Sequence, residues 1–141
     1  MKKILVSLLA ALSLGSLALS AQTINTLEDG KYSISVGDVV LTVDASRGGK
    51  IVSFKCQDKE VLSTTRMPNS FGSTFWTSPQ SEWNWPPVAE YDRKPFKAEV
   101  NGNVLVLTGE KSERFGYRVR KEFTADAKNN SISIKYTIIN E

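Results

Sequence analysis

Two kinds of side chain are scarce in this sequence of 141 residues: histidine is absent, and Cys56 is the only cysteine. Without histidine, the chain has no imidazole to act as a general acid or base, to activate a nucleophile or to bind zinc in the commonest way. A single cysteine excludes an internal disulfide, so stability must come from a packed core. Cys56 alternates in phase with Val52 and Phe54, which predicts a small buried apolar residue rather than a reactive thiol.

Excess charge of either sign is also lacking. The sequence carries 18 basic and 15 acidic residues, but Lys2 and Lys3 lie in a segment that we expect to be removed, which leaves one net positive charge. One short stretch is rich in basic residues and contains Arg114, Arg118, Arg120 and Lys121. In a strand these side chains would point to both faces, so they would not form one basic patch. Nucleic acid is therefore not an expected partner.

The longest apolar run lies near the N-terminus and has the composition of a secretory signal peptide. Lys2 and Lys3 form a basic start, residues 4–19 are mostly apolar, and Ala21 is the small residue that a signal peptidase requires. Polar sequence follows at once without a positively charged flank, so we expect no retained membrane anchor. The sequence predicts a signal peptide over residues 1–21 and an exported mature protein, periplasmic or extracellular.

Alternation of apolar and polar residues with a period of two dominates the rest of the chain. Such alternation is typical of half-buried strands, and no window outside residues 1–21 carries a helical stripe. The alternating runs lie at residues 32–36, 39–43, 52–56, 104–107, 117–123 and 132–138. At 104–107 either the two valines or the two leucines could face the core. Short strands separated by turn residues predict one all-β domain over residues 22–141, an antiparallel β-sandwich.

An aromatic segment without periodicity lies inside the long stretch from about Ser63 to Pro95. It runs from Phe71 to Pro87, reads FGSTFWTSPQSEWNWPP and contains all three tryptophans. Connections of this length in compact domains tend to carry function. Two interpretations of this segment are equally supported by the sequence. Flat indole rings beside short polar side chains form a platform for a sugar or a nucleobase, or the tryptophans fold back and plug one end of the sandwich.

On the platform interpretation, the predicted carbohydrate-binding residues come from this segment and its N-terminal flank. The indoles would stack on a sugar ring and belong to Trp76, Trp83 and Trp85. The polar side chains would bond hydroxyls and belong to Gln80, Glu82 and Asn84. Arg66 and Arg93 flank the segment and could hold the carboxylate of an acidic sugar, although a surface charge is the commoner role for Arg66.

The same stretch contains three acids, Glu82, Glu90 and Asp92. Two carboxylates across a glycosidic bond could serve as acid and base, and loop oxygens can bind calcium. Neither possibility has a companion signature such as an EF-hand loop, so solvated loop charges are the favoured interpretation. We therefore expect no catalytic residue, no metal site and no cofactor in this chain.

Three segments resemble the galactose-mutarotase-like superfamily. Arg47–Phe54 is similar to the glycine turn and strand near the start of those domains, and Ser131–Asn140 is similar to the strand before their central part. Phe75–Gln80 and Trp83–Pro87 resemble a secreted bacterial family of unknown function within that superfamily. Together the segments span nearly all of the mature chain but only the N-terminal part of such a domain.

The resemblance implies a β-supersandwich whose concave face and loops hold a carbohydrate. Mutarotases use histidines and a carboxylate from the C-terminal half, and this chain has neither, so mutarotation is not carried over. The predicted last strand stops just before Glu141, which favours a truncated domain at least as much as a complete one. A truncated sandwich would leave an open sheet edge at Ser131–Ile139, through which the protein could self-associate.

Three functions of different classes follow from these expectations. The leading one is a secreted carbohydrate-binding domain without catalysis of its own. The alternative is the N-terminal part of a carbohydrate-active enzyme, an epimerase, lyase or hydrolase, whose catalytic residues lie in a missing C-terminal half. The second alternative is an exported structural or interaction protein whose aromatic loop packs against a partner.

Overall fold

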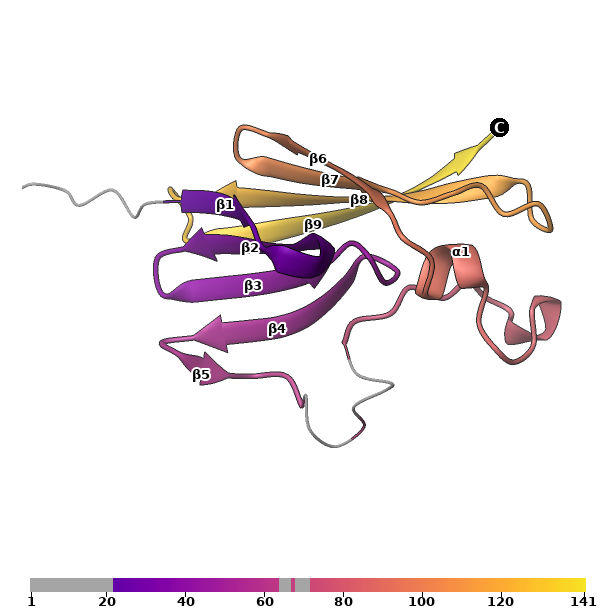
Figure 1. Cartoon of the computed structure of the whole chain (residues 1–141), viewed down its shortest axis with the longest axis horizontal. Helices are drawn as coiled ribbons and strands as arrows, with labels where there is room; N and C mark the ends of the chain where they lie inside the picture. The colour runs from indigo at the N-terminus through magenta and orange to yellow at the C-terminus, as the bar shows by residue number, and fades with distance from the viewer. Residues whose placement is uncertain (1–21, 64–66, 68–71) are drawn as a thin grey trace, which may run out of the picture.

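The computed structural model describes residues 22–63, 67 and 72–141 as two antiparallel sheets that face each other (Figure 1). The first sheet has the order β1-β2-β3-β4-β5, with β1 Gln22–Thr26, β2 Lys31–Val36, β3 Val39–Asp44, β4 Lys50–Cys56 and β5 Lys59–Glu60. The second has the order β6-β7-β8-β9, with β6 Lys97–Asn101, β7 Val104–Thr108, β8 Tyr117–Asp126 and β9 Ser131–Asn140. The predicted all-β antiparallel sandwich is confirmed.

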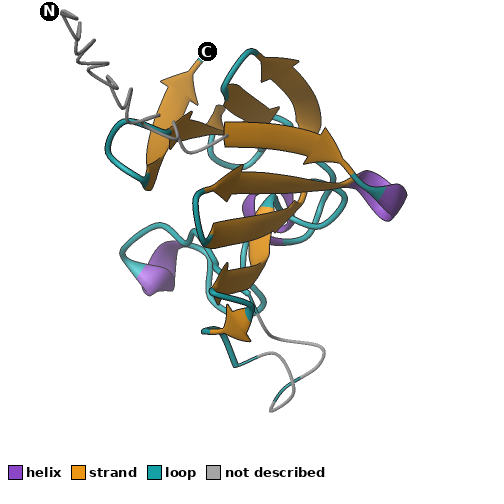
Figure 2. Ribbon diagram, turned by 90° about the vertical axis from the view of Figure 1, so that its left-hand side faces the viewer, coloured by secondary structure: helices purple, strands orange, loops and turns teal. Residues whose placement is uncertain are grey.

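Helical structure is confined to short turns, so strands make up nearly all of the regular structure in Figure 2. Two are 3-10 helices, η1 Glu28–Gly30 and η2 Gln80–Glu82, and the third is the α-helix α1, Ala89–Asp92. Within the described ranges, no helix has the length and apolar character needed to cross a membrane.

Three strands were not predicted from the alternation of apolar and polar residues, namely β1, β5 and β6. Each lies at the edge of its sheet, and most of their residues are exposed or half-buried. A strand without a buried face lacks the apolar alternation by which strands are recognised in a sequence. The predicted central strands are confirmed because their inner faces are buried.

The core lies between the two sheets and is continuous. From the first sheet it includes Ile34, Val36, Leu41, Val43 and Ala45, and from the second Leu105, Leu107, Val119, Phe123 and Ala125. Leu105 and Leu107 are fully buried, which settles that the leucines of β7 face inward and the valines outward.

Strand β4 does not keep one face inward along its whole length. The register with β3 shifts between Thr42 and Val43, so Val43 pairs with Ile51 while Leu41 pairs with Phe54. Burial then falls toward the end of the strand, and Cys56 is exposed. The prediction that Cys56 is a buried hydrophobe was wrong. Alternation specifies which side of the sheet a residue faces, but the extent of the opposite sheet decides whether that side is covered.

A lysine joins the two sheets inside this core. Lys121 follows the inward alternation of β8 between Val119 and Phe123 and is only 1% exposed. Its ammonium group donates hydrogen bonds to the carbonyl oxygens of Gly48 (2.7 Å) and Gly49 (3.1 Å). The nitrogen also lies over the rings of Phe96 and Tyr136, at 5.1 and 5.6 Å from their centroids. A buried ammonium is tolerated when it is hydrogen-bonded in this way.

The turn that accepts these bonds is packed tightly against α1. Gly48 has φ +68°, and its amide donates to the carbonyl of Lys94 at 2.9 Å. A Cβ atom placed on Gly48 would lie 2.1 Å from the carbonyl oxygen of Asp92. Only glycine fits here, because both the backbone angle and the close approach exclude a side chain.

We expect Gly48→Ala to destabilise the protein strongly. Gly102→Ala is the matched control, since Gly102 has a similar φ of +60° but open space within 4 Å of the point where a Cβ would lie. The unfolding free energy of the control should fall by only about 1–2 kcal/mol, which is the cost of placing an alanine in the left-handed region. Gly48→Ala should lose at least about 2 kcal/mol more, since backbone atoms would have to move. Urea unfolding of both variants measures the difference, and equal losses would contradict this packing.

Candidate functional site

The aromatic segment lies beside α1, at the end of the sandwich where β4 and β8 begin (Figure 1). The hydroxyl of Tyr91 donates to the carbonyl of Tyr117 at 3.0 Å, and their rings stack with centroids 5.1 Å apart. This contact fixes α1 to the first residue of β8. Within the segment, η2 closes a turn in which Asn84 has φ +56° and its amide donates to the Gln80 carbonyl at 2.7 Å.

Trp83 lies inside the segment rather than on its surface. It is 6% exposed, and its indole nitrogen donates to the carbonyl of Thr77 at 2.9 Å. A buried indole with a satisfied N–H group is a structural element of its loop. The plug interpretation therefore describes Trp83, which is not available to stack on a ligand.

Trp76 and Trp85 are placed differently, with exposed fractions of 46% and 71%. The Trp76 ring contacts both others edge to face, with centroids 5.9 Å from Trp83 and 5.9 Å from Trp85. The planes of Trp76 and Trp85 meet at 85°, so the two exposed rings form a corner. These two indoles, which we call the tryptophan corner, have the exposure that the platform interpretation requires.

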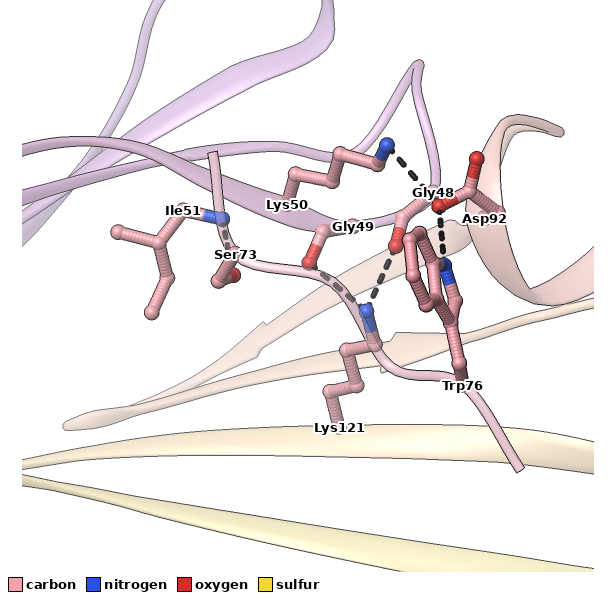
Figure 3. A network of polar contacts seen from close by, with 8 residues as sticks. All are labelled: Gly48, Gly49, Lys50, Ile51, Ser73, Trp76, Asp92 and Lys121. Atoms are coloured by element: carbon pink, nitrogen blue, oxygen red, sulfur yellow. Dashed lines mark hydrogen bonds and ion pairs between the residues drawn. The ribbon is translucent and has the colours of Figure 1, made fainter. Parts of the chain in front are cut away.

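The tryptophan corner is anchored to the sandwich through a carboxylate. The indole nitrogen of Trp76 donates to Oδ1 of Asp92 at 2.9 Å, and the same oxygen lies 3.1 Å from the ammonium of Lys50 (Figure 3). The side chains of Lys50 and Asp92 are 10% and 14% exposed. The hydrogen bond to this carboxylate orients the Trp76 ring, and the contact with Lys50 fixes the carboxylate in turn.

A second anchor lies just before Trp76 in the chain. The hydroxyl of Ser73 accepts a hydrogen bond from the Ile51 amide at 2.9 Å, and the Ser73 amide donates to the Ile51 carbonyl at 3.0 Å. Phe75 then stacks on Tyr136 with centroids 5.2 Å apart. The segment is therefore attached to β4 and to β9 before it reaches the tryptophan corner.

The predicted polar residues share this end of the molecule. Gln80, Glu82 and Asn84 are all exposed, on η2 and the residue that follows Trp83. Arg114 holds this turn from the other side, since its guanidinium donates to the carbonyls of Glu82 and Trp83. Arg66 lies outside the described residues.

The three acids of the segment have three different environments. Glu82 is exposed, as expected of a solvated charge. Glu90 lies 2.8 Å from the ammonium of Lys94, and the hydrogen bond from Lys94 lowers the pKa of Glu90. Asp92 is half-buried between Trp76 and Lys50, so its interpretation as a solvated loop charge was wrong. In the described part of the chain, no cluster of three or more acidic or cysteine side chains is arranged to hold a metal ion.

Sequence reasoning missed Lys50 and Lys121, which complete the network of Figure 3. The signal for Lys121 was its place in the buried phase of β8, between two apolar residues. The pKa of Lys121 is lowered from 10.5 to about 8, mainly by burial and also by the positive charge of Lys50, while Asp92 opposes the shift.

The space around the tryptophans is open rather than enclosed. The aromatic cluster of Trp76, Trp83, Pro87 and Tyr91 leaves no internal room, so a ligand would contact its outer rings. A cleft of about 200 Å³ lies on the other side of Trp83, against α1.

A larger cavity, of about 630 Å³, lies between β4 and β9. Its lining includes Leu41, Ile51, Phe54, Ile132 and Ile134, and none of the residues that line it is titratable. This cavity has the size of a ligand pocket. However, its walls are the inner faces of the two sheets, so it is part of the core that the described residues leave uncovered.

No protein-family model and no curated protein matches this chain. The site must therefore be interpreted from its own chemistry. That chemistry consists of two exposed indoles, short polar side chains beside them, and a shielded ion pair that fixes one indole. It suits recognition of a ring with apolar faces and hydroxyl edges, and it offers no nucleophile with an adjacent base.

The titration of Lys121 makes stability depend on pH in a defined direction. Because its folded pKa of about 8 lies below the unfolded value of 10.5, the unfolded chain binds more protons between these limits, and the contribution of Lys121 to stability rises with pH. The shift corresponds to about 3 kcal/mol.

We expect the difference in unfolding free energy between the wild-type protein and Lys121→Met to grow in favour of the wild type from pH 7.5 to 10.5. Urea unfolding across this range measures it, because titrations common to both proteins cancel. Lys128→Met is the control, since Lys128 is exposed in the turn after β8. A pH-independent difference for Lys121→Met would contradict a buried ammonium.

Proposed function

We propose that the protein is an exported carbohydrate-binding domain that contacts a saccharide through the tryptophan corner and performs no catalysis with its own residues. One observation carries this proposal: Trp76 and Trp85 present exposed rings in edge contact, and Trp76 is held by a hydrogen bond to Asp92. Exposed apolar side chains that gather in one place often mark a binding surface, whereas single ones do not. The resemblance to the galactose-mutarotase-like superfamily, whose members bind sugars, supports the same assignment.

The geometry of the corner favours a pyranose ring over a flat, stacked ligand. Two rings at 85° cannot both lie parallel to one planar base, so a nucleobase would use only one of them. A pyranose has an apolar C–H face for one indole and a second apolar edge for the other. Gln80, Glu82 and Asn84 are exposed nearby and can reach the hydroxyls at the rim.

Anchoring through Asp92 makes the corner a preorganised surface. A free indole would lose rotamer freedom on binding, at a cost of about 0.5–1.5 kcal/mol. The hydrogen bond from Trp76 to Asp92 removes part of that cost in advance. The same arrangement orients the ring for one class of ligand, since a rotated Trp76 would lose its edge contacts with both neighbours.

We expect titration with a panel of mono- and oligosaccharides to change tryptophan fluorescence and to protect it from acrylamide. Trp85→Ala should weaken the binding of the responding sugar at least about tenfold, or 1.4 kcal/mol. Leu27→Ala is the control, because Leu27 is also exposed but precedes η1 on the first sheet. Fluorescence and chemical shifts that no sugar changes would sink the proposal.

A second candidate function, self-association, is favoured by β9. This strand pairs only with β8 among the described strands, so one of its edges has free backbone groups. Ile134 and Ile138 pair with the core residues Phe123 and Val119 and share their face, yet they are 38% and 54% exposed. An open edge with an uncovered apolar face can pair with the same strand of a second copy.

We expect light scattering to detect a concentration-dependent dimer that Ile134→Lys combined with Ile138→Lys disrupts, because buried lysines oppose edge pairing. Lys135→Gln is the control, since Lys135 lies on the opposite face of β9 and should leave the dimer intact. A monomer at every concentration tested would rule this function out.

A further inference from the structure

The cleft beside Trp83 has a composition that the tryptophan corner lacks. Its volume is about 200 Å³, and it lies between α1 and the connection from β7 to β8. Its lining includes Trp83, Pro86, Glu90, Arg93, Arg114 and Phe115. The volume is below the range of pockets that enclose a whole small-molecule ligand, so the cleft suits a single substituent.

Two arginines give the cleft a positive charge. In the described part of the chain, no carboxylate lies within ion-pair distance of Arg93 or Arg114. The one acid in the lining, Glu90, is already paired with Lys94 at 2.8 Å. The charge of Arg93 also helps to lower the pKa of Glu90, so Glu90 offsets part of the positive charge of this wall. Neither guanidinium group is in ion-pair contact with a carboxylate in the described ranges, and the cleft therefore keeps positive charge.

Arg114 is held in a defined position in this wall. Its guanidinium lies over the ring of Phe115, 5.0 Å from the centroid, and donates to the carbonyls of Glu82 and Trp83. A guanidinium has five N–H donors, so these bonds leave others free. Arg93 follows α1 and is exposed, which leaves its side chain able to close on a group bound in the cleft.

The cleft and the tryptophan corner are neighbours. Trp83 lines the cleft and also contacts the Trp76 ring, and Pro86 of the cleft wall is bonded directly to Trp85. A ligand stacked on Trp85 would therefore have a charged substituent or the next sugar residue within reach of the arginines.

We infer that this cleft binds an anionic substituent of the saccharide, a carboxylate or a sulfate ester, so that the ligand is an acidic carbohydrate. The inference rests on the proposed function, because the tryptophan corner supplies the contact with the sugar ring. Planar, bidentate guanidinium groups match the oxygens of both anions. The charge selects acidic over neutral saccharides, while the indoles are indifferent to charge.

The test compares oligosaccharides that differ only in charge. Oligogalacturonate, oligoglucuronate and oligomannuronate are each titrated beside their methyl esters, and a sulfated galactan oligosaccharide beside its desulfated form. At low salt the wild-type protein should bind at least one acidic member about fivefold or more tightly than its neutral counterpart. A preference among the uronates identifies a carboxylate, and one confined to the sulfated galactan identifies a sulfate.

The variants then locate the preference. Arg93→Gln should abolish it while binding of the neutral counterpart is kept, and Arg93→Lys should retain part of it. Lys128→Gln removes one positive charge beyond the far end of β8 and should retain it fully. Equal binding of acidic and neutral members, or a preference that survives Arg93→Gln, overturns the inference and leaves the proposed function standing. Failure of every saccharide to bind overturns both.

Discussion

The contact between the Gly48–Gly49 turn and its neighbours is the constraint on which the rest of the structure depends. The turn connects β3 to β4 in the first sheet, accepts two hydrogen bonds from Lys121 of the second, and touches the backbone of Asp92 in the segment that carries the tryptophans. Three parts of the chain that are far apart in sequence therefore meet at two glycines. The approach is close enough that a side chain on Gly48 would separate them.

The charged side chains at this junction affect both the stability and the geometry of the protein. An ammonium inside a sandwich is unfavourable, and its burial and the nearby Lys50 depress the pKa of Lys121. An apolar residue of similar volume would often stabilise a core equally well. The charged groups instead fix orientations. The hydrogen bonds of Lys121 determine which carbonyl groups face the second sheet, and the Asp92–Lys50 pair determines the orientation of the Trp76 ring. The contacts at this junction therefore also fix the exposed ring of Trp76.

That surface divides into two parts with different chemistry. The tryptophan corner offers aromatic faces that suit a sugar ring. The cleft beside Trp83 offers two guanidinium groups that form no ion pair with a carboxylate in the described part of the chain. The buried Trp83 joins the parts, because one side of its ring contacts Trp76 and another lines the cleft. At the other side of the sandwich, the uncovered inner face of β9 is apolar and lacks such groups, which suits a protein surface rather than a polar ligand.

Local sequence pattern was sufficient for the class of fold and for the strands with a buried face, because their apolar residues alternate with a period of two. It also found β9, which alternates in the same way although none of its residues is buried. It was also sufficient to locate the aromatic segment, whose composition differs from that of any strand. It could not separate Trp83 from Trp76 and Trp85, since three identical side chains differ only in what covers them. Cys56 and Asp92 were misjudged for the same reason. The opposite sheet does not reach far enough to cover Cys56, and the Asp92 carboxylate is half-buried between Trp76 and Lys50. Contacts between distant parts of the chain bring together Lys50, Asp92 and Lys121. Only the tertiary structure determines that these side chains are buried and which groups they pair with, because burial and pairing depend on neighbours that the local sequence does not contain.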